Sequence, residues 1–369
     1  MTAPRLDIHL DRIHHNAGVL VQRLAARGIS VCGVTKATLG SPAIARELIR
    51  GGVTSIGESR IENIEALRGA GITEPMMLIR APMPSQVTRV VANADISLNT
   101  ELDTISRLSA AAIAQHRRHG VVLMVELGDL REGILAGDLA AVVRVVLDLD
   151  GVELRGIGAN LACQSGVAPD AENMSVLSDL ADRIEATFGV RLDMVSGGNS
   201  ANLDWALGPT GSDPAGAGEM GRINHLRLGE SILLGCEPLQ RTPIDGLHTD
   251  AISVVAEVIE SKTKPSLPWG HLDQTAFGHR AALPDRGDRT RVIVALGRQD
   301  VDPDGLVPPD GLEILGASSD HLVLDAGAAS VAVGSELRFG LNYAAMLRAM
   351  TSPFVTRAWF RDGTACAGP

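Results

Sequence analysis

Aromatic residues are scarce in this chain of 369 residues, which has three tryptophans, five phenylalanines and a single tyrosine, Tyr343. The core must therefore be built mainly from aliphatic side chains, and any site that needs two tyrosines is excluded. Cysteines are also few. Their spacing is not that of a metal site, so we expect no bound metal and a reducing, cytoplasmic setting; they are Cys32, Cys163, Cys236 and Cys366.

Runs of positive charge and long apolar segments are absent as well. The formal net charge is −11, and no cluster of lysine and arginine is present to neutralise a phosphate backbone, which argues against a nucleic-acid partner. No apolar run reaches the roughly 18 residues needed to cross a bilayer, and residues 1–5 do not open an apolar signal sequence. We therefore expect no membrane partner and a small-molecule ligand.

What the sequence does contain is an alternation of short β-branched runs with segments of helical periodicity, from residue 29 to residue 230. This alternation predicts βα units and a parallel sheet, and eight such units predict a closed (β/α)8 barrel. The expected strands are Ser30–Thr35, Val53–Gly57, Pro75–Arg80, Asp95–Leu98, Gly120–Leu127, Val152–Asn160, Leu192–Ser196 and Asn224–Leu228.

The alternation stops near residue 240, so we expect a barrel domain over residues 1–240 and a mostly β domain over residues 241–369. The strands expected in the second domain are Ile252–Glu260, Arg291–Leu296, Leu312–Leu315, His321–Leu324, Leu337–Gly340 and Phe354–Phe360.

Active sites of such barrels lie at the carboxyl ends of the strands. The first strand ends at Lys36, which is either an amine presented to a substrate or an ordinary solvated cation. The seventh is followed by Ser196-Gly197-Gly198-Asn199-Ser200, and the eighth carries Arg227 and Gly229. Backbone amides freed by glycine at the start of a helix suit a phosphate, although a plain glycine-rich turn is the alternative.

Several segments together resemble the alanine/ornithine racemase family of pyridoxal-phosphate (PLP) enzymes of fold type III, and are closest to its ornithine-racemase branch. The resemblance covers most of the chain. The segments are Val34-Thr35-Lys36-Ala37-Thr38, Gly57-Glu58-Ser59-Arg60-Ile61-Glu62-Asn63, residues 126–133, residues 196–200, Leu226-Arg227-Leu228-Gly229-Glu230, residues 316–322 and Asn342-Tyr343.

The resemblance implies a role for each matching residue. Lys36 forms the Schiff base with PLP and then acts as a base at the substrate Cα. Ser196, Asn199 and Ser200, with the amides near Gly229 and Glu230, belong to the cofactor site and its phosphate cradle, and Asn160 lies against the pyridine ring. Arg227 faces the pyridine nitrogen, which a guanidinium cannot protonate, so proton transfer is favoured over carbon–carbon cleavage. Arg131 meets the cofactor oxygen or the substrate carboxylate, unless it only pairs with Glu132 or Glu126.

The chain departs from the family at its second base. Alanine racemases use one tyrosine from the partner subunit's second domain as the opposite base and another on the phosphate, and Tyr343 cannot fill both roles. The candidates are Asp320, His321 and Asp300, of which we prefer the first two, while His321 also has a purely structural alternative. Because neighbouring residues of a strand point to opposite faces, we expect at most one of Asp320 and His321 to enter the site.

The function that the resemblance implies is that of a PLP-dependent amino-acid racemase. The substrates it implies are basic amino acids such as ornithine or lysine, with alanine, serine or a broad range left open. The resemblance also implies a homodimer whose second domain closes the partner's site. One alternative is another reaction on the same fold, an aldolase, dehydratase or decarboxylase. A second is a non-catalytic PLP-homeostasis protein, but such proteins match the barrel alone.

Overall fold

The computed structural model describes residues 2–208, 218–278 and 284–366. The described residues form two compact units, one from residues 11–249 and the other from residues 2–10 together with residues 250–366. Residues 2–10, which we expected in the barrel domain, therefore belong to the β-rich unit. From Asp250 onward the described chain belongs to the β-rich unit, and this boundary lies ten residues after residue 240, where we expected it.

The first unit is a closed barrel of eight parallel strands, as the alternation predicts. Each strand pairs in parallel with the next, and the last closes on the first with Gly33 opposite Leu228. The strands are β2 (Ser30–Val34), β3 (Ser55–Glu58), β4 (Met76–Leu78), β5 (Ile96–Asn99), β6 (His119–Met124), β7 (Val152–Gly158), β8 (Met194–Gly198) and β9 (His225–Leu228).

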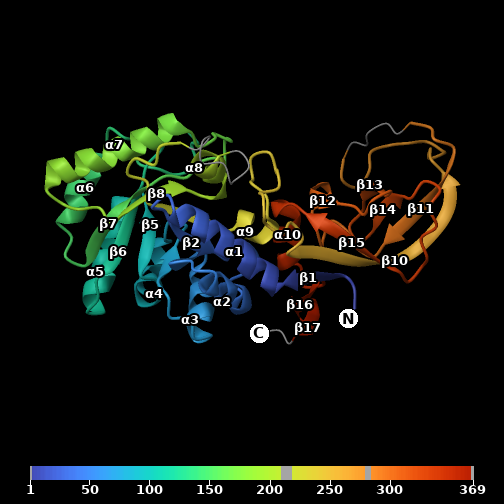
Figure 1. Cartoon of the computed structure of the whole chain (residues 1–369), viewed down its shortest axis with the longest axis horizontal. Helices are drawn as coiled ribbons and strands as arrows, with labels where there is room; N and C mark the ends of the chain where they lie inside the picture. The colour runs from blue at the N-terminus through green and yellow to red at the C-terminus, as the bar shows by residue number, and fades with distance from the viewer. Residues whose placement is uncertain (1, 209–217, 279–283, 367–369) are drawn as a thin grey trace. The chain divides into compact units, whose positions relative to one another are not determined.

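Helices surround this barrel (Figure 1) and cover its strands with aliphatic side chains. They are α1 (Leu10–Ala25), α2 (Pro42–Arg50), α3 (Ile61–Gly69), α4 (Val87–Asn93), α5 (Leu102–Ala114), α6 (Leu139–Leu147), α7 (Ala171–Phe188), α8 (Leu203–Leu207) and α9 (Glu230–Leu234). Short 3-10 helices also follow some strands, namely η1 (Lys36–Thr38), η2 (Pro84–Gln86) and η3 (Ser200–Asn202).

The barrel core is aliphatic and sulfur-rich, as the scarcity of aromatics requires. One buried cluster joins five side chains from four strands: Cys32, Met77, Leu98, Val122 and Met124. Flexible methionines fill irregular space without the volume of a ring. No helix within the described ranges has both the length and the apolar character needed to span a bilayer.

The second unit is a nine-stranded sheet with one helix and a short 3-10 turn. Its central strands are β10 (Ile252–Pro265), β11 (Asp288–Val294), β13 (Glu313–Ala317), β14 (Leu322–Asp325), β15 (Glu336–Leu341) and β16 (Thr356–Arg361), which agree with the six expected strands. The sequence patterns miss β1 (Arg5–His9), β12 (Leu306–Val307), β17 (Thr364–Cys366), α10 (Tyr343–Thr351) and η5 (Pro303–Gly305).

Strand β1 explains why the first residues leave the barrel. It pairs antiparallel with β10, Leu6 facing Val254, and parallel with β16, so the blue strand in Figure 1 lies among orange and red ones. Leu6 and Ile8 are fully buried. Five residues with two apolar positions are too short a pattern to be distinguished from a loop by sequence alone.

Candidate active site at the end of the barrel

Lys36 opens η1, directly after β2, so the sequence places it where barrel enzymes carry their catalytic groups. The turn that carries it is held by Glu58, a fully buried carboxylate at the end of the neighbouring strand β3. Thr35 Oγ1 donates to Glu58 Oε1 at 2.9 Å, and Asn63 Nδ2 and the Ser59 amide donate to Oε2 at 3.1 and 3.0 Å. The residue before the lysine is thus fixed by its side chain.

The surroundings of Lys36 favour its neutral amine. Burial lowers the pKa of Lys36, and the guanidinium groups of Arg131 and Arg227 lower it further, while Cys163 and Glu230 act in the opposite direction. A neutral lysine is needed both as a nucleophile towards an aldehyde and as a base, so the lowered pKa suits either role.

Arg227 is a buried cation on β9, with a side chain fixed by neutral acceptors. It donates to Ser196 Oγ, to the Ala159 carbonyl at 2.8 Å and to Asn160 Oδ1 at 3.4 Å. Ser196 Oγ is in turn 2.8 Å from His225 Nδ1. Burial lowers the pKa of Arg227 to about 10, which still leaves it charged at neutral pH. Ser196, which we expect in the cofactor site, thus contacts another of the residues expected there, Arg227.

Asn160 and Asn199 join the ends of β7 and β8. Asn199 Nδ2 donates to Asn160 Oδ1 at 3.2 Å and to the Leu161 carbonyl at 2.9 Å, while its own Oδ1 accepts from the Ala201 amide at 2.8 Å. The buried Nδ2 of Asn160 has no acceptor among the described residues. A buried donor without a partner is costly, so this amide suits a bound group that accepts a hydrogen bond.

Ser200 lies where the segments after β8 and β9 meet. Its Oγ is 3.0 Å from Ser231 Oγ and accepts from the Ser231 amide at 3.3 Å, so it stands at the first turn of α9. Gly229 precedes that helix, and a Cβ there would lie 3.0 Å from the Val34 carbonyl oxygen, so the close approach of β9 to the end of β2 favours glycine. The predicted phosphate residues are thus adjacent in space.

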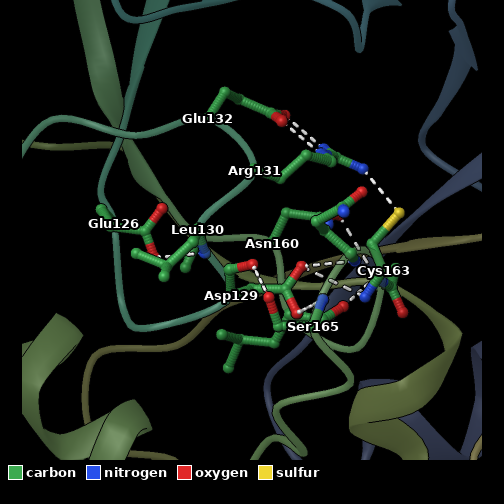
Figure 2. A network of polar contacts seen from close by, with 12 residues as sticks. Glu126, Asp129, Leu130, Arg131, Glu132, Asn160, Cys163 and Ser165 are labelled. Carbon is green, nitrogen blue, oxygen red and sulfur yellow. Dashed lines mark hydrogen bonds and ion pairs between the residues drawn. The ribbon is translucent and has the colours of Figure 1, made fainter.

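Arg131 lies in the loop after β6, held on both sides (Figure 2). Its guanidinium pairs with Glu132, and Nη1 lies 2.8 Å from Cys163 Sγ in the loop after β7. Asp129 fixes the two loops together by accepting from the amides of residues 163–165 at 2.9 to 3.2 Å. Of the two carboxylates considered as partners for Arg131, Glu132 is the one paired, since Glu126 accepts from backbone amides.

The candidates for the second base lie in the β-rich unit. Asp320 and His321 occupy the turn between β13 and β14 rather than a strand, and His321 Nδ1 is 2.7 Å from Asp320 Oδ1. The expectation that they point to opposite faces is therefore wrong, because a turn does not alternate its side chains. Asp300 is buried and committed, accepting from the Gly297 amide at 3.1 Å and from Ser352 Oγ at 3.2 Å.

Sequence reasoning gave no role to two residues that the structure brings to this site. Glu58 supports the lysine turn, and Cys163 contacts Arg131 and influences the charge of Lys36. A carboxylate at the last position of a barrel strand was a usable signal for Glu58, since buried acids are rare unless they are bonded. Cys163 follows its strand by five residues, and only the folded loop shows its neighbour.

Residues 8–231 match the family described as "Alanine racemase, N-terminal domain". The chain belongs to this family. It is 39% identical over 361 residues to the lysine racemase of Thermotoga maritima, covering 97% of this chain and 99% of the relative. It is 38% identical over 358 residues to the ornithine racemase of Acetoanaerobium sticklandii, covering 96% and 99%.

Solved structures of this fold extend over the whole chain. An alanine racemase of Clostridium difficile 630 superposes with a TM-score of 0.74 at 18% identity, covering all of this chain and 98% of the other. A D-threonine aldolase of Filomicrobium marinum gives a TM-score of 0.76 at 16% identity, covering 100% and 94%. At these identities the likeness establishes the fold, a barrel followed by a mostly β unit, and leaves the reaction to the site.

Proposed function

We propose that this protein is a PLP-dependent racemase of basic amino acids. The observation that carries the proposal is Lys36, a mostly desolvated amine at the end of the first barrel strand, in a chain that matches lysine and ornithine racemases over nearly its full length. The identity to those two relatives favours a substrate with a cationic side chain, and the net charge of −11 agrees with it.

The residues present fit PLP. Lys36 supplies the amine for covalent attachment, and Ser200 with the amides at the start of α9 supplies donors for the phosphate. The unpartnered amide of Asn160 and the guanidinium of Arg227 supply donors for the ring. When bound, the cofactor supplies the electron sink that makes the substrate Cα–H acidic.

The protein groups then control where protons go. Lys36 takes or returns a proton at Cα on one face, since its pKa is lowered by burial and by two guanidinium groups. Arg227 is a donor that stays charged, so the ring nitrogen facing it would stay unprotonated, which favours reversible proton transfer over bond cleavage. Arg131 is a cation suited to the substrate carboxylate.

The opposite face needs a second base, and we assign it to the Asp320–His321 pair. His321 Nδ1 lies 2.7 Å from Asp320 Oδ1, so the carboxylate can orient the imidazole for proton transfer. We further propose that the enzyme acts in the cytoplasm as a homodimer, as the resemblance to alanine racemases implies.

The proposal is tested by incubating the PLP-loaded protein with each enantiomer of lysine, ornithine, alanine and serine in deuterated water. Chiral chromatography should show interconversion of lysine or ornithine, with deuterium at Cα of the product. Release of ammonia or loss of the carboxylate would instead indicate a dehydratase or a decarboxylase. Absence of labelling from either enantiomer of every amino acid would overturn the proposal.

A further inference from the structure

The carboxylate of Glu230 lies beside the lysine turn. Strands β9 and β2 pair with Leu228 opposite Gly33, and Gly229 packs against Val34. Continuing this register by one residue brings Glu230, after β9, next to the residues after β2 that lead into Lys36. Consistent with this register, the two charges attract each other.

The other acidic groups at this end of the barrel either accept hydrogen bonds from the protein or are exposed to solvent. The acids within two residues of a barrel strand's end are Glu58, Glu101, Glu126 and Glu230. Glu58 accepts three hydrogen bonds, Glu126 accepts from two backbone amides, and Glu101 is exposed to solvent. The Glu230 carboxylate is partly buried, and among the described residues it accepts no hydrogen bond and forms no ion pair, although the charges of Arg241 and Lys36 attract it.

A partly buried carboxylate without a donor loses hydration that nothing in its surroundings replaces. Two cations attract this carboxylate, Arg241 and Lys36. Lys36 loses its charge once it is attached to a cofactor, so Arg241 alone would then oppose the charge of the carboxylate. The Glu230 amide points along the axis of α9 while its side chain projects from the helix, so amide and carboxylate can serve different ligands.

We propose that the Glu230 side chain is the specificity determinant that binds the distal ammonium group of a basic amino-acid substrate. This inference rests on the proposed function. An ammonium is the ligand that a carboxylate without a donor requires, and an ion pair in a partly desolvated site discriminates strongly against a substrate that lacks the charge.

The test compares lysine with norleucine, which has nearly the same shape but no distal ammonium, in wild type and in Glu230→Gln. We expect the ratio of the two kcat/KM values to fall about 10- to 100-fold in the variant, mainly through KM for lysine. Glu230→Asp, which keeps the charge, should retain a preference for lysine. Glu101→Gln, the same change at the exposed acid that follows β5, should keep the wild-type ratio.

A binding measurement separates this inference from the proposed function. The dissociation constants of 1,5-diaminopentane and 1-aminopentane for the PLP-loaded protein are measured by calorimetry, and neither amine can be racemised. Wild type should prefer the diamine, and Glu230→Gln should lose most of that preference. An unchanged preference in Glu230→Gln, for the amines or for the amino acids, would overturn the inference. If wild type racemises no amino acid, the proposed function fails, and the amine pair still decides the role of Glu230.

Discussion

The end of the barrel and the β13–β14 turn each hold titratable groups, but the cause of the pKa shifts differs between the two regions. At the barrel, burial sets the chemistry, because it lowers the pKa of Lys36 and raises the pKa of Glu230 to about 7. At the turn, Asp320 and His321 are about half exposed, and the pKa of Asp320 is lowered by its hydrogen bond to His321.

The barrel unit by itself therefore favours the form of Lys36 that the proposed proton transfer needs. Lys36 has its neutral form favoured and its turn held by Glu58 within one unit. Asp320 is stabilised as an anion by its hydrogen bond to His321, which makes the carboxylate a weak base.

The largest effect is expected from Lys36→Ala. Without the amine there is no covalent attachment of the cofactor and no base on one face, so racemisation should fall by more than about 10⁴-fold. The visible absorbance band of the bound cofactor should also disappear. Lys262→Ala removes a lysine paired with Glu260 on β10 and should leave both measurements at wild-type values. Retention of the band in Lys36→Ala would refute the assignment.

The second largest effect on activity is expected from a substitution in the β13–β14 turn. His321→Asn should lower kcat by about 100-fold or more if the imidazole carries protons on the opposite face. Exchange of the Cα proton with deuterated water should survive for the enantiomer that Lys36 deprotonates and be lost for the other. His116→Asn is the control, since this exposed histidine has φ of 54°, which asparagine tolerates. Equal loss of exchange from both enantiomers would argue against a one-face role.

The barrel was predictable because its signals repeat. Eight short apolar strands alternate with helices, and the rule that barrel sites lie at the carboxyl ends of strands selects candidate residues such as Lys36 and Arg227. The β-rich unit gives weaker signals, and β1 could not be assigned because its partners β10 and β16 lie more than 240 residues away. Pairing over such a distance leaves no local pattern.

Within the site, the sequence does not predict what each residue contacts. Ser196 reads as a phosphate residue in a serine-glycine motif, yet it lies inside the barrel, where it accepts from Arg227. The alternation of side chains on β8 and β9 decides this, and it depends on a register shift between Ser196 and Gly198 that no sequence pattern reveals.

A smaller effect is expected from Glu58→Gln. The new amide would present N–H groups to Thr35 or Asn63, which already donate, so the free energy of unfolding should fall by about 1–3 kcal/mol. Calorimetry should show a lower Tm, and the pH dependence of the cofactor band should shift because the turn of Lys36 loosens. Glu47→Gln, at a buried acid of α2 paired with Arg50, should lower Tm without moving the band. Unchanged Tm and band in Glu58→Gln would mean that the carboxylate does not hold the turn.

The smallest effect concerns the stability of the cofactor-free protein. Burial raises the pKa of Glu230 from 4.5 to about 7, so the folded state holds this proton more tightly than the unfolded state. Between those pH values the carboxylate therefore costs stability progressively as the pH rises, and the cost is complete above pH 7. Glu230→Gln removes that ionisation, so its Tm relative to wild type should be higher at pH 8 than at pH 5, by a few degrees at most. Glu101→Gln, at an exposed acid, should show no such pH-dependent difference, and a flat difference for Glu230→Gln would indicate that its carboxylate is as well solvated as that of Glu101.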